Sequence, residues 1–272
     1  MTTLQLGKKT NYKNKYNPSL LFAISRKEKR KEININTIAL PFTGYDLWNC
    51  YEVTWLNAAG KPEIALAELI VPCDSPYLIE SKSLKIYLVS FSNTKFESKE
   101  EVERTIKTDL EKTLCSALKV RLLQINELFI KLLPSFTAKN LDSIKIKCDT
   151  YIPNKNFLST EVQLTRESLC SDLFKSNCPV TNQPDYASIL IKYEGQKINH
   201  AGLLQYIISY RNQTEFHEQC VERIFIDIKE KCLPNKLTVY ARYTRRGGID
   251  ISPLRTDDKD FKINNNIRLL RQ

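Results

Sequence analysis

A chain of 272 residues with 42% hydrophobic and 26% charged side chains has the balance of a globular protein of one large or two ordinary domains, which excludes a disordered chain. The formal charge of +10 favours anionic partners, so both a phosphorylated cofactor and a basic RNA-binding role are open. Residues 64–72, the longest apolar stretch, are too few to span a membrane, and residues 1–9 lack the apolar core of an export signal, so we expect a cytoplasmic protein without a membrane partner.

The sequence repeats itself without a gap at an offset of 119 residues. The matched positions of the first half are Leu84, Tyr87, Ser90, Phe91 and Asn93, and those of the second half are Leu203, Tyr206, Ser209, Tyr210 and Asn212. The tripeptide Val-Glu-Arg at 102–104 recurs at 221–223. Two similar amphipathic helices arising by coincidence are the alternative, but the number of ungapped matches favours a duplication.

Each copy is expected to contain the same elements in the same order. In the first copy they are an extended segment at 63–71, helices at 83–92 and 98–116, and a strand at 118–125. In the second copy they are an extended segment at 186–193, helices at 201–211 and 217–233, and a strand at 236–243. Val102, Ile106 and Leu110 follow helical spacing, and Ser98 with Glu101 forms a capping box. The predicted fold class is α+β, with two helices on one face of an antiparallel sheet in each unit.

These elements divide the chain into an N-terminal unit at 1–134, a linker at 135–156 and a C-terminal unit at 157–272. The linker is polar and rich in lysine, although residues 144–148 suit a strand.

The two copies differ in their polar residues. Glu80-Ser81-Lys82 of the first copy is replaced by Asn-His-Ala in the second, and His217-Glu218 of the second copy is replaced by Ser-Lys in the first. This division predicts a site assembled from both copies, so that one copy alone is inactive.

Cys178 is the candidate nucleophile among eight cysteines, none of which forms a C-x-x-C pair. The absence of such a pair argues against zinc ribbons and thioredoxin-like centres, and we expect reduced thiols. Two prolines and two asparagines place Cys178 on an ordered loop before a strand, where a thiol is expected to be accessible. Asp185 follows seven residues later and can protonate what a thiolate attacks. Spacing alone leaves a reactive and a structural Cys178 equally open.

Glu218 opens a predicted helix, where the backbone N–H groups favour a carboxylate. It is therefore either a charge that stabilises the helix start or an acceptor for the paired N–H donors of a guanine-type ring, and Glu80 suits the same purpose. His217 is one of only two histidines, which argues against a multi-histidine metal site within one chain.

Arg245-Arg246-Gly247-Gly248 combines guanidinium groups with glycines that permit close approach of a ligand. This segment is either a phosphate site, to which Lys82 and Lys85 contribute, or a tight turn with solvated arginines. No G-x-G-x-x-G or P-loop sequence occurs, so any dinucleotide binds outside a Rossmann fold.

Four segments together resemble the long, two-module form of the NADPH-dependent 7-cyano-7-deazaguanine reductases, the nitrile reductases of queuosine biosynthesis, a tRNA modification pathway. They are residues 80–87 (ESKSLKIY), 178–185 (CPVTNQPD), 216–223 (FHEQCVER) and 240–248 (YARYTRRGG). The resemblance runs from about residue 17 to the C-terminus and is weakest at 135–157. It implies tandem tunnelling-fold units, related to GTP cyclohydrolase I, that associate as a homodimer and do not bind nucleic acid directly.

The resemblance also implies residue roles. Cys178 would form a covalent thioimide with the nitrile carbon, and Asp185 would donate protons. The residues implied to bind the deazaguanine are Ile79, Glu80, Ser81, His217 and Glu218. Those implied to bind NADPH are Ser81, Lys82, Arg246 and Gly247, and no metal is required. A zinc-dependent GTP cyclohydrolase-like hydrolase and a basic RNA-binding protein remain the alternatives.

Overall fold

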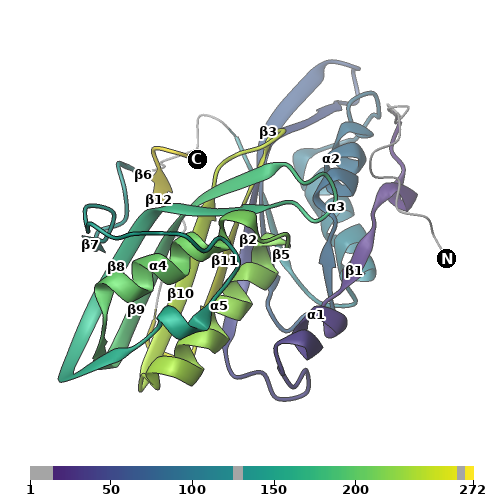
Figure 1. Ribbon diagram of the computed structural model, residues 1–272. Coiled ribbons are helices and arrows are strands. Elements are labelled where there is room, and N and C mark those ends of the chain that lie inside the picture. Colours follow the sequence, from purple (N-terminus) through teal and green to yellow (C-terminus); the bar gives the residue numbers. More distant parts are fainter. Residues whose placement is uncertain (1–14, 125–130, 262–266) are drawn as a thin grey trace. The chain divides into compact units, whose positions relative to one another are not determined.

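The computed structural model describes residues 15–124, 131–261 and 267–272 (Figure 1). Residues 1–9 and Ile125, on which two of the expectations rest, lie outside this part. The chain forms two compact units. Of the described residues, unit one contains 15–32, 45–124 and 245–251, and unit two contains 33–44, 131–244, 252–261 and 267–272. Within the described ranges, no helix is long and apolar enough to cross a membrane.

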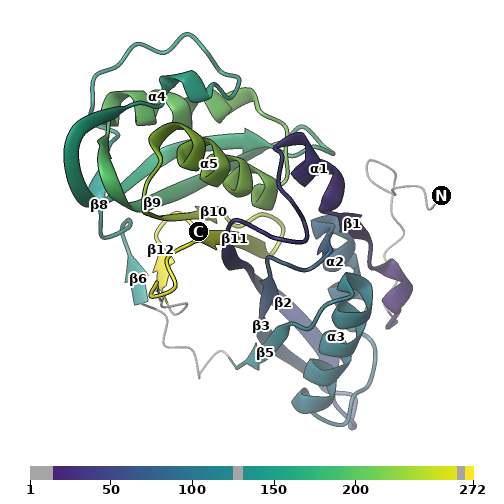
Figure 2. The same cartoon turned by 90° about the horizontal axis from the view of Figure 1, so that it is seen from below.

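Unit one is an antiparallel sheet with two helices on one face (Figures 1 and 2). Its sheet has the order β5-β3-β2, and residues 249–251 of β11 also belong to this unit. Its elements are η1 (Pro18–Leu20), β1 (Ala23–Ser25), α1 (Lys27–Glu32), β2 (Thr43–Leu56, from residue 45), β3 (Pro62–Pro72), β4 (Tyr77–Ile79), α2 (Ser81–Val89), α3 (Lys99–Leu114) and β5 (Lys119–Leu123). Val102, Ile106 and Leu110 of α3 are fully buried in the core, so the predicted apolar stripe is confirmed.

Unit two repeats this architecture with longer strands (Figure 2). Helices α4 and α5 cover one face of strands in the order β11-β10-β9-β8-β7, of which only β7 and β8 run parallel. The elements are β6 (Lys131–Leu133), β7 (Lys139–Asn140), η3 (Lys155–Phe157), β8 (Thr160–Asn177), β9 (Pro184–Ile198), α4 (His200–Ser209), η4 (Tyr210–Asn212), α5 (His217–Cys232), β10 (Lys236–Tyr243), β11 (Ile249–Thr256, from residue 252) and β12 (Ile267–Leu269).

The same hydrogen bonds recur in the two units, which supports the duplication. Tyr87 Oη donates to Asp109 Oδ2 over 2.6 Å, and Tyr206 Oη donates to Asp227 Oδ2 over 2.7 Å. The two tyrosines are 119 residues apart, but the two aspartates are only 118 apart. The long helices are therefore related by 118 residues, and the ungapped repeat predicted from the sequence is wrong within them.

Burial in the long helices follows the offset of 118. The buried stripe Val102, Ile106, Leu110 and Leu114 of α3 corresponds to the buried Cys220, Ile224, Ile228 and Cys232 of α5. Both helices then end at a residue in the left-handed conformation, Cys115 and Leu233. The recurring Val-Glu-Arg letters are thus displaced by one residue from the structural match.

Part of the expected linker belongs to the repeated structure. In unit one, the N–H of Asn17 donates to Ser90 Oγ over 3.2 Å. In unit two, the N–H of Asn154 donates to Ser209 Oγ over the same distance. Asn17 and Asn154 each cap a short 3-10 helix, η1 and η3 respectively. Residues 144–148 form no strand, contrary to the alternative considered for them.

Candidate active site

Cys178 lies at the base of the loop that joins β8 to β9. Its N–H donates to the carbonyl oxygen of Gln183, and its own carbonyl oxygen accepts from the N–H of Asn182, both over 2.9 Å. Asn182 adopts a positive φ of 55°, which closes the loop tightly. Only 9% of Cys178 is exposed. The loop was predicted correctly, but the expectation of an accessible thiol was wrong, because these hydrogen bonds draw Cys178 back against the strand ends.

Asp185 stands beside this loop at the start of β9. The strand register pairs Asp185 with Ser176 and Pro184 with Asn177. Residues paired across two strands point to the same face, so Ser176 and Asp185 share a face, and Cys178 follows directly after the end of β8. The structure thus brings the predicted proton donor to the same end of the hairpin as the predicted nucleophile.

His217 contacts Asp185 from the first turn of α5. Its Nε2 lies 3.2 Å from Asp185 Oδ2, and their side chains are 15% and 6% exposed respectively. The helix start is fixed by the N–H of Phe216, which donates to Gln219 Oε1 over 3.2 Å. Glu218 follows in the first turn and is 2% exposed, where the helix dipole stabilises its negative charge. Unit two therefore gathers Cys178, Asp185, His217 and Glu218 around one hairpin end and one helix start.

The side chains behind this group are buried and neutral. The Tyr243 ring stacks on the imidazole of His217 with centroids 3.7 Å apart and planes at 12°. Burial raises the pKa of the Tyr243 hydroxyl and that of the Cys220 thiol far above their ordinary values, so both keep their protons. Cys220 is thus an inert thiol. Tyr243 belongs to one of the four recognised segments, but no sequence pattern predicts its contact with His217.

The remaining predicted residues that bind the base lie in unit one. Ile79 ends β4, and Glu80 caps α2. Glu80 Oε1 accepts from the N–H of Lys82 over 2.9 Å, and Oε2 accepts from the N–H of Ser83 over 2.7 Å. Glu80 is only 4% exposed. Its carboxylate is therefore held rigidly, with both oxygens already accepting one hydrogen bond from the helix it caps. Ser81 is the first residue of that helix.

The predicted cofactor residues also lie in unit one. The turn at 245–249 is closed by a hydrogen bond from the N–H of Arg246 to the carbonyl oxygen of Ile249 over 2.9 Å. Gly247 and Gly248 have φ values of 58° and 75°, which favour glycine. A Cβ on Gly247 would lie 3.0 Å from Lys85 Nζ, so the turn adjoins α2, which also carries Ser81 and Lys82. Guanidinium and ammonium groups beside the backbone of Gly247 fit the phosphates of a dinucleotide, and the carboxylate of Glu52 lies against the neighbouring Gly248.

The buried carboxylate of Asp250 lies next to this turn and is hydrogen-bonded to residues of β2. Asp250 accepts hydrogen bonds from Tyr51 Oη over 2.5 Å and from the Asn49 side-chain amide over 2.9 Å. The N–H of Tyr51 donates to the carbonyl oxygen of Gly248 over 2.9 Å, and the Arg245 guanidinium lies 4.9 Å from the centre of the Tyr51 ring. Neither Tyr51 nor Asp250 was predicted, because no sequence pattern links them to the turn.

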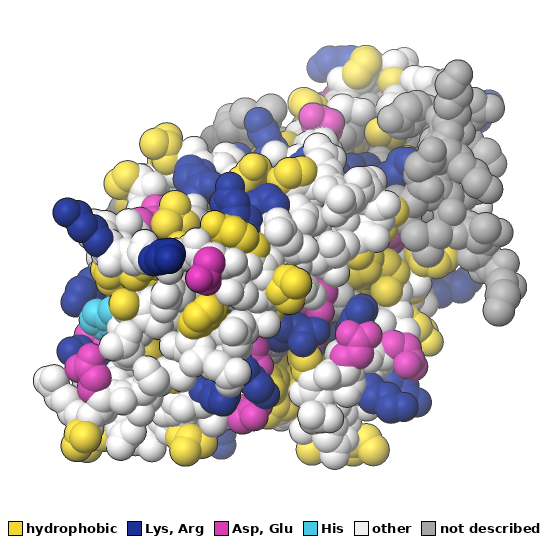
Figure 3. Space-filling view, in the orientation of Figure 1, with side chains coloured by type: hydrophobic (Ala, Val, Ile, Leu, Met, Phe, Trp, Pro, Cys, Tyr) yellow, Lys and Arg dark blue, Asp and Glu magenta, His cyan; other side chains and the backbone are white. Residues whose placement is uncertain are grey.

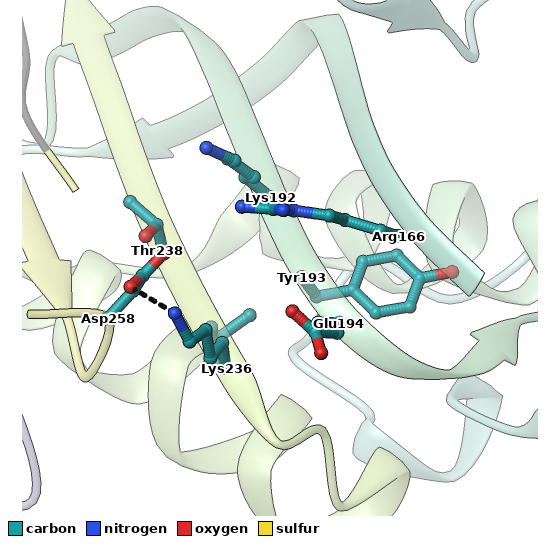
Figure 4. A pocket seen from close by; sticks show the side chains of 8 residues that line it. Arg166, Lys192, Tyr193, Glu194, Lys236, Thr238 and Asp258 are labelled. Atoms are coloured by element: carbon teal, nitrogen blue, oxygen red, sulfur yellow. Dashed lines mark hydrogen bonds and ion pairs between the residues drawn. The ribbon is translucent and has the colours of Figure 1, made fainter. Parts of the chain in front are cut away.

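A separate hollow lies at the other end of the strands of unit two (Figure 4). Glu194 and Lys236 pair there, whereas Ala187 pairs with Tyr243 at the end near Asp185. Lys236 points to Asp258, to which it forms an ion pair of 2.9 Å, and Arg166 and Lys192 extend beside each other (Figure 4). None of the predicted catalytic or binding residues lines this hollow.

Charged side chains of both signs are mixed on the face seen in Figure 3. Lysine and arginine side chains are scattered there among acidic and hydrophobic ones instead of forming one continuous basic surface (Figure 3). Within residues 15–124, 131–261 and 267–272, no three His, Cys, Asp or Glu side chains are grouped so as to hold a metal ion.

Comparison with known proteins gives matches along most of the chain. The family model described as "Nitrile reductase, 7-cyano-7-deazaguanine-reductase N-term" matches residues 12–122, and the one described as "QueF-like protein" matches residues 184–261. A solved structure, the archaeosine synthase QueF-Like in the apo form, is similar at a TM-score of 0.31 and 16% identity over 35% of this chain and 94% of its own. That structural likeness is too weak to define the fold.

Curated relatives match the chain almost from end to end. Proteins named NADPH-dependent 7-cyano-7-deazaguanine reductase are 49% identical in Legionella pneumophila (strain Lens), 50% in Paraburkholderia phytofirmans and 50% in Coxiella burnetii. Each match covers 98% of this chain, and 94%, 97% and 96% of the respective relatives. The chain belongs to the family of NADPH-dependent 7-cyano-7-deazaguanine reductases, as its four segments predicted.

Proposed function

We propose that this protein reduces the nitrile of 7-cyano-7-deazaguanine to an aminomethyl group with NADPH, in queuosine biosynthesis. The observation that carries this proposal is the gathering of Cys178, Asp185 and His217 at one hairpin end, in a chain half identical to reductases of that name. A thiol and a buried carboxylate at the same end of a hairpin provide the nucleophile and the proton donor that attack on a nitrile needs.

The first step activates the nitrile. The sulfur of Cys178 adds to the nitrile carbon, and the thiol proton passes through Asp185 to the nitrile nitrogen, which yields a thioimide on Cys178. A thioimide carbon accepts a hydride more readily than a nitrile carbon does. Asp185 suits this proton transfer because it lies at the same end of the β8–β9 hairpin as Cys178 and its carboxylate is contacted by His217.

The remaining steps consume two hydrides and two protons for each nitrile. NADPH supplies one hydride in each of two rounds. After the first, Asp185 protonates nitrogen and the carbon–sulfur bond breaks, which returns the thiolate of Cys178 and leaves a protonated imine. In the second round the carbon of this imine gains a hydride, giving the amine, and the thiolate of Cys178 takes up the second proton to regenerate the thiol. The 9% exposure of Cys178 supports a site that keeps water from hydrolysing the imine.

Residues of both units are assigned binding roles in this proposal. Glu218, together with Glu80, accepts the ring amide and amino N–H groups of the base, and Ile79, Ser81 and His217 complete its site. The cofactor phosphates bind to Ser81, Lys82, Arg246 and Gly247. The fit rests on the cationic side chains and positive-φ glycines that meet at the turn.

The central test is NADPH consumption with 7-cyano-7-deazaguanine as substrate. Cys178→Ala and Asp185→Ala are expected to abolish turnover, and Cys115→Ala, which removes an exposed thiol at the end of α3, is expected to leave it unchanged. Mass spectrometry should find the substrate attached covalently to the wild type but not to Cys178→Ala. Inactive wild type, or an active Cys178→Ala variant, refutes the proposal.

A second test separates binding of the base from that of the cofactor. Glu218→Gln keeps the size of the side chain but removes the charge that accepts two N–H donors. The Kd for the base should rise while the Kd for NADPH stays the same. Equal Kd values for the base in both proteins would assign Glu218 to the helix start alone.

The organisation of the chain is part of the proposal. Tandem tunnelling-fold units at 1–134 and 157–272, joined through 135–156, would associate as a cytoplasmic homodimer that does not bind nucleic acid. The sheet with two helices on one face in each unit, and the hydrogen bonds repeated between Tyr87 and Asp109 and between Tyr206 and Asp227, support the duplication. Light scattering coupled to size exclusion tests the dimer, and a monomeric active enzyme would contradict it.

A further inference from the structure

Tyr243 occupies a position that no binding or catalytic role explains. It is the last residue of β10 and pairs with Ala187, two residues beyond Asp185 on the same face of β9. The N–H of the next residue, Thr244, donates to the carbonyl oxygen of Tyr186 over 2.9 Å, so the backbone on both sides is paired with β9. The register alone therefore brings the Tyr243 ring to the end of the sheet where Asp185 lies.

The Tyr243 ring is fixed from behind. Only 1% of Tyr243 is exposed. The ring of Phe174, fully buried after the bulge in β8, meets it edge-on with centroids 5.9 Å apart and planes at 63°. Burial keeps the hydroxyl of Tyr243 protonated, close to Cys220 and Ser176. A ring held in this way presents one flat and immobile face.

That face carries the imidazole of His217. The two rings are separated by 3.7 Å between centroids and are nearly parallel at 12°. Stacking fixes the plane of the imidazole but is compatible with both orientations related by a 180° flip about the Cβ–Cγ bond. The second constraint comes from Asp185 Oδ2, which lies 3.2 Å from His217 Nε2. Together the two contacts determine the orientation of His217 completely.

We infer that Tyr243 is a positioning residue, which holds His217 flat so that its Nε2 meets the carboxylate of Asp185. This inference rests on the proposed function of Asp185 as proton donor. A carboxylate that carries protons must keep one oxygen directed to the reacting group, and an imidazole fixed on its other oxygen prevents the side chain from turning away. Tyr243 acts through its ring face, and its hydroxyl, which lies close to Cys220 and Ser176, takes no part in the contact.

The test compares Tyr243→Phe, which keeps the ring face, with Tyr243→Leu, which removes it. Without the stacked ring, His217 no longer holds the carboxylate of Asp185 in its reactive position. The kcat of Tyr243→Leu should therefore fall by about tenfold to a hundredfold. The Kd for NADPH should stay unchanged, and Tyr243→Phe should remain within about twofold of the wild-type kcat. If Tyr243→Leu unfolds, Tyr243→Met provides a flexible side chain of comparable length without a ring face.

A spectroscopic measurement separates positioning from general damage. The chain has only two histidines, so a ¹³C-histidine NMR spectrum contains one set of signals from His217 and one from His200. The ring current of Tyr243 should shift the His217 protons upfield in the wild type and in Tyr243→Phe, and this shift should vanish in Tyr243→Leu. His200, which is bound to Glu167 at 3.0 Å, reports whether unit two is intact and should not move.

The kcat values and the His217 signals of the Tyr243 variants show whether the ring face positions His217. Wild-type kcat in Tyr243→Leu, or a large loss in Tyr243→Phe, overturns the inference, the latter because the hydroxyl would then be the active group. Unchanged His217 signals in Tyr243→Leu also overturn it. A wild-type protein without nitrile reductase activity contradicts the proposed function only, because the NMR comparison is made on the free protein and still tests the stack.

Discussion

The buried ion pair between Glu222 and Arg255 allows a prediction about stability that is independent of the active site. Arg255 on β11 is completely buried and Glu222 on α5 is 3% exposed. Both Nε and Nη2 of Arg255 donate to Glu222 Oε1, over 3.1 and 2.9 Å. Glu222→Leu leaves the guanidinium charge buried without this carboxylate. Breaking such a pair costs about 3–5 kcal/mol. At roughly 2–4 °C per kcal/mol, the midpoint of thermal unfolding should fall by roughly 6–20 °C.

Two further variants make this prediction specific. Glu230→Leu, on the same helix, removes an ion pair with Lys155 whose side chains are 56% and 41% exposed, and should cost about 1 kcal/mol or less. The double variant Glu222→Leu/Arg255→Met removes both buried charges and should recover most of the lost stability. Differential scanning calorimetry provides the measurement. A Glu222→Leu variant within about 1 kcal/mol of wild type, or a double variant no more stable than the single one, refutes the reasoning.

Three more predictions follow from other contacts. Tyr51→Phe removes the hydroxyl that donates to Asp250 beside the glycine turn, so the Kd for NADPH, measured by fluorescence titration, should rise while the Kd for the base stays constant. An unchanged Kd for NADPH would show that the conformation of the turn does not depend on this hydrogen bond. Gly202→Ala places a Cβ 2.2 Å from the carbonyl oxygen of Phe157, so the start of α4 must shift, and urea denaturation should show a loss of about 1–3 kcal/mol; a loss below this range would mean that the backbone adapts freely. Burial raises the pKa of Cys170 to about 11, whereas an unfolded thiol ionises near pH 8.5. Between these pH values the folded state keeps a proton that the unfolded state has lost, so the free energy of unfolding should fall as the pH rises from about 8.5 to 11. Cys170→Ala should make this decline less steep, and an identical decline in that variant would contradict the assignment.

The helices were predictable because their signals are local. The helix expected at 217–233 is His217–Cys232, and the one expected at 98–116 is Lys99–Leu114, begun as predicted by Ser98, whose Oγ accepts from the N–H of Glu101 over 3.2 Å. The long strands β2 and β8 were not predicted. Each contains a bulge, between Cys50 and Val53 and between Ser171 and Phe174, which interrupts the alternation of buried and exposed residues from which strands are recognised.

The site shows a similar limit. Cys178, Asp185, His217 and Glu218 were found from the sequence because each belongs to a recognisable segment. Their supports were not, because the stack of Tyr243 on His217 joins residues from different elements and follows from the strand register. The repeat illustrates the same point, since matching letters align Val102 with Val221, whereas burial aligns it with Cys220. Matching residue identities can reveal a duplication, but the buried positions show which residues are structurally equivalent.

The division of the chain has a consequence for its biosynthesis. Unit one includes residues 245–251, which carry Arg246 and Gly247 and follow almost all of unit two along the chain. Unit one can therefore complete its fold only after residues 245–251, which follow residues 130–244 of unit two, have been translated. Until then, nascent unit one exposes a strand edge next to Tyr51, whose N–H is later satisfied by Gly248. Premature termination before residue 245 should thus leave unit one incomplete, although most of its residues are made first.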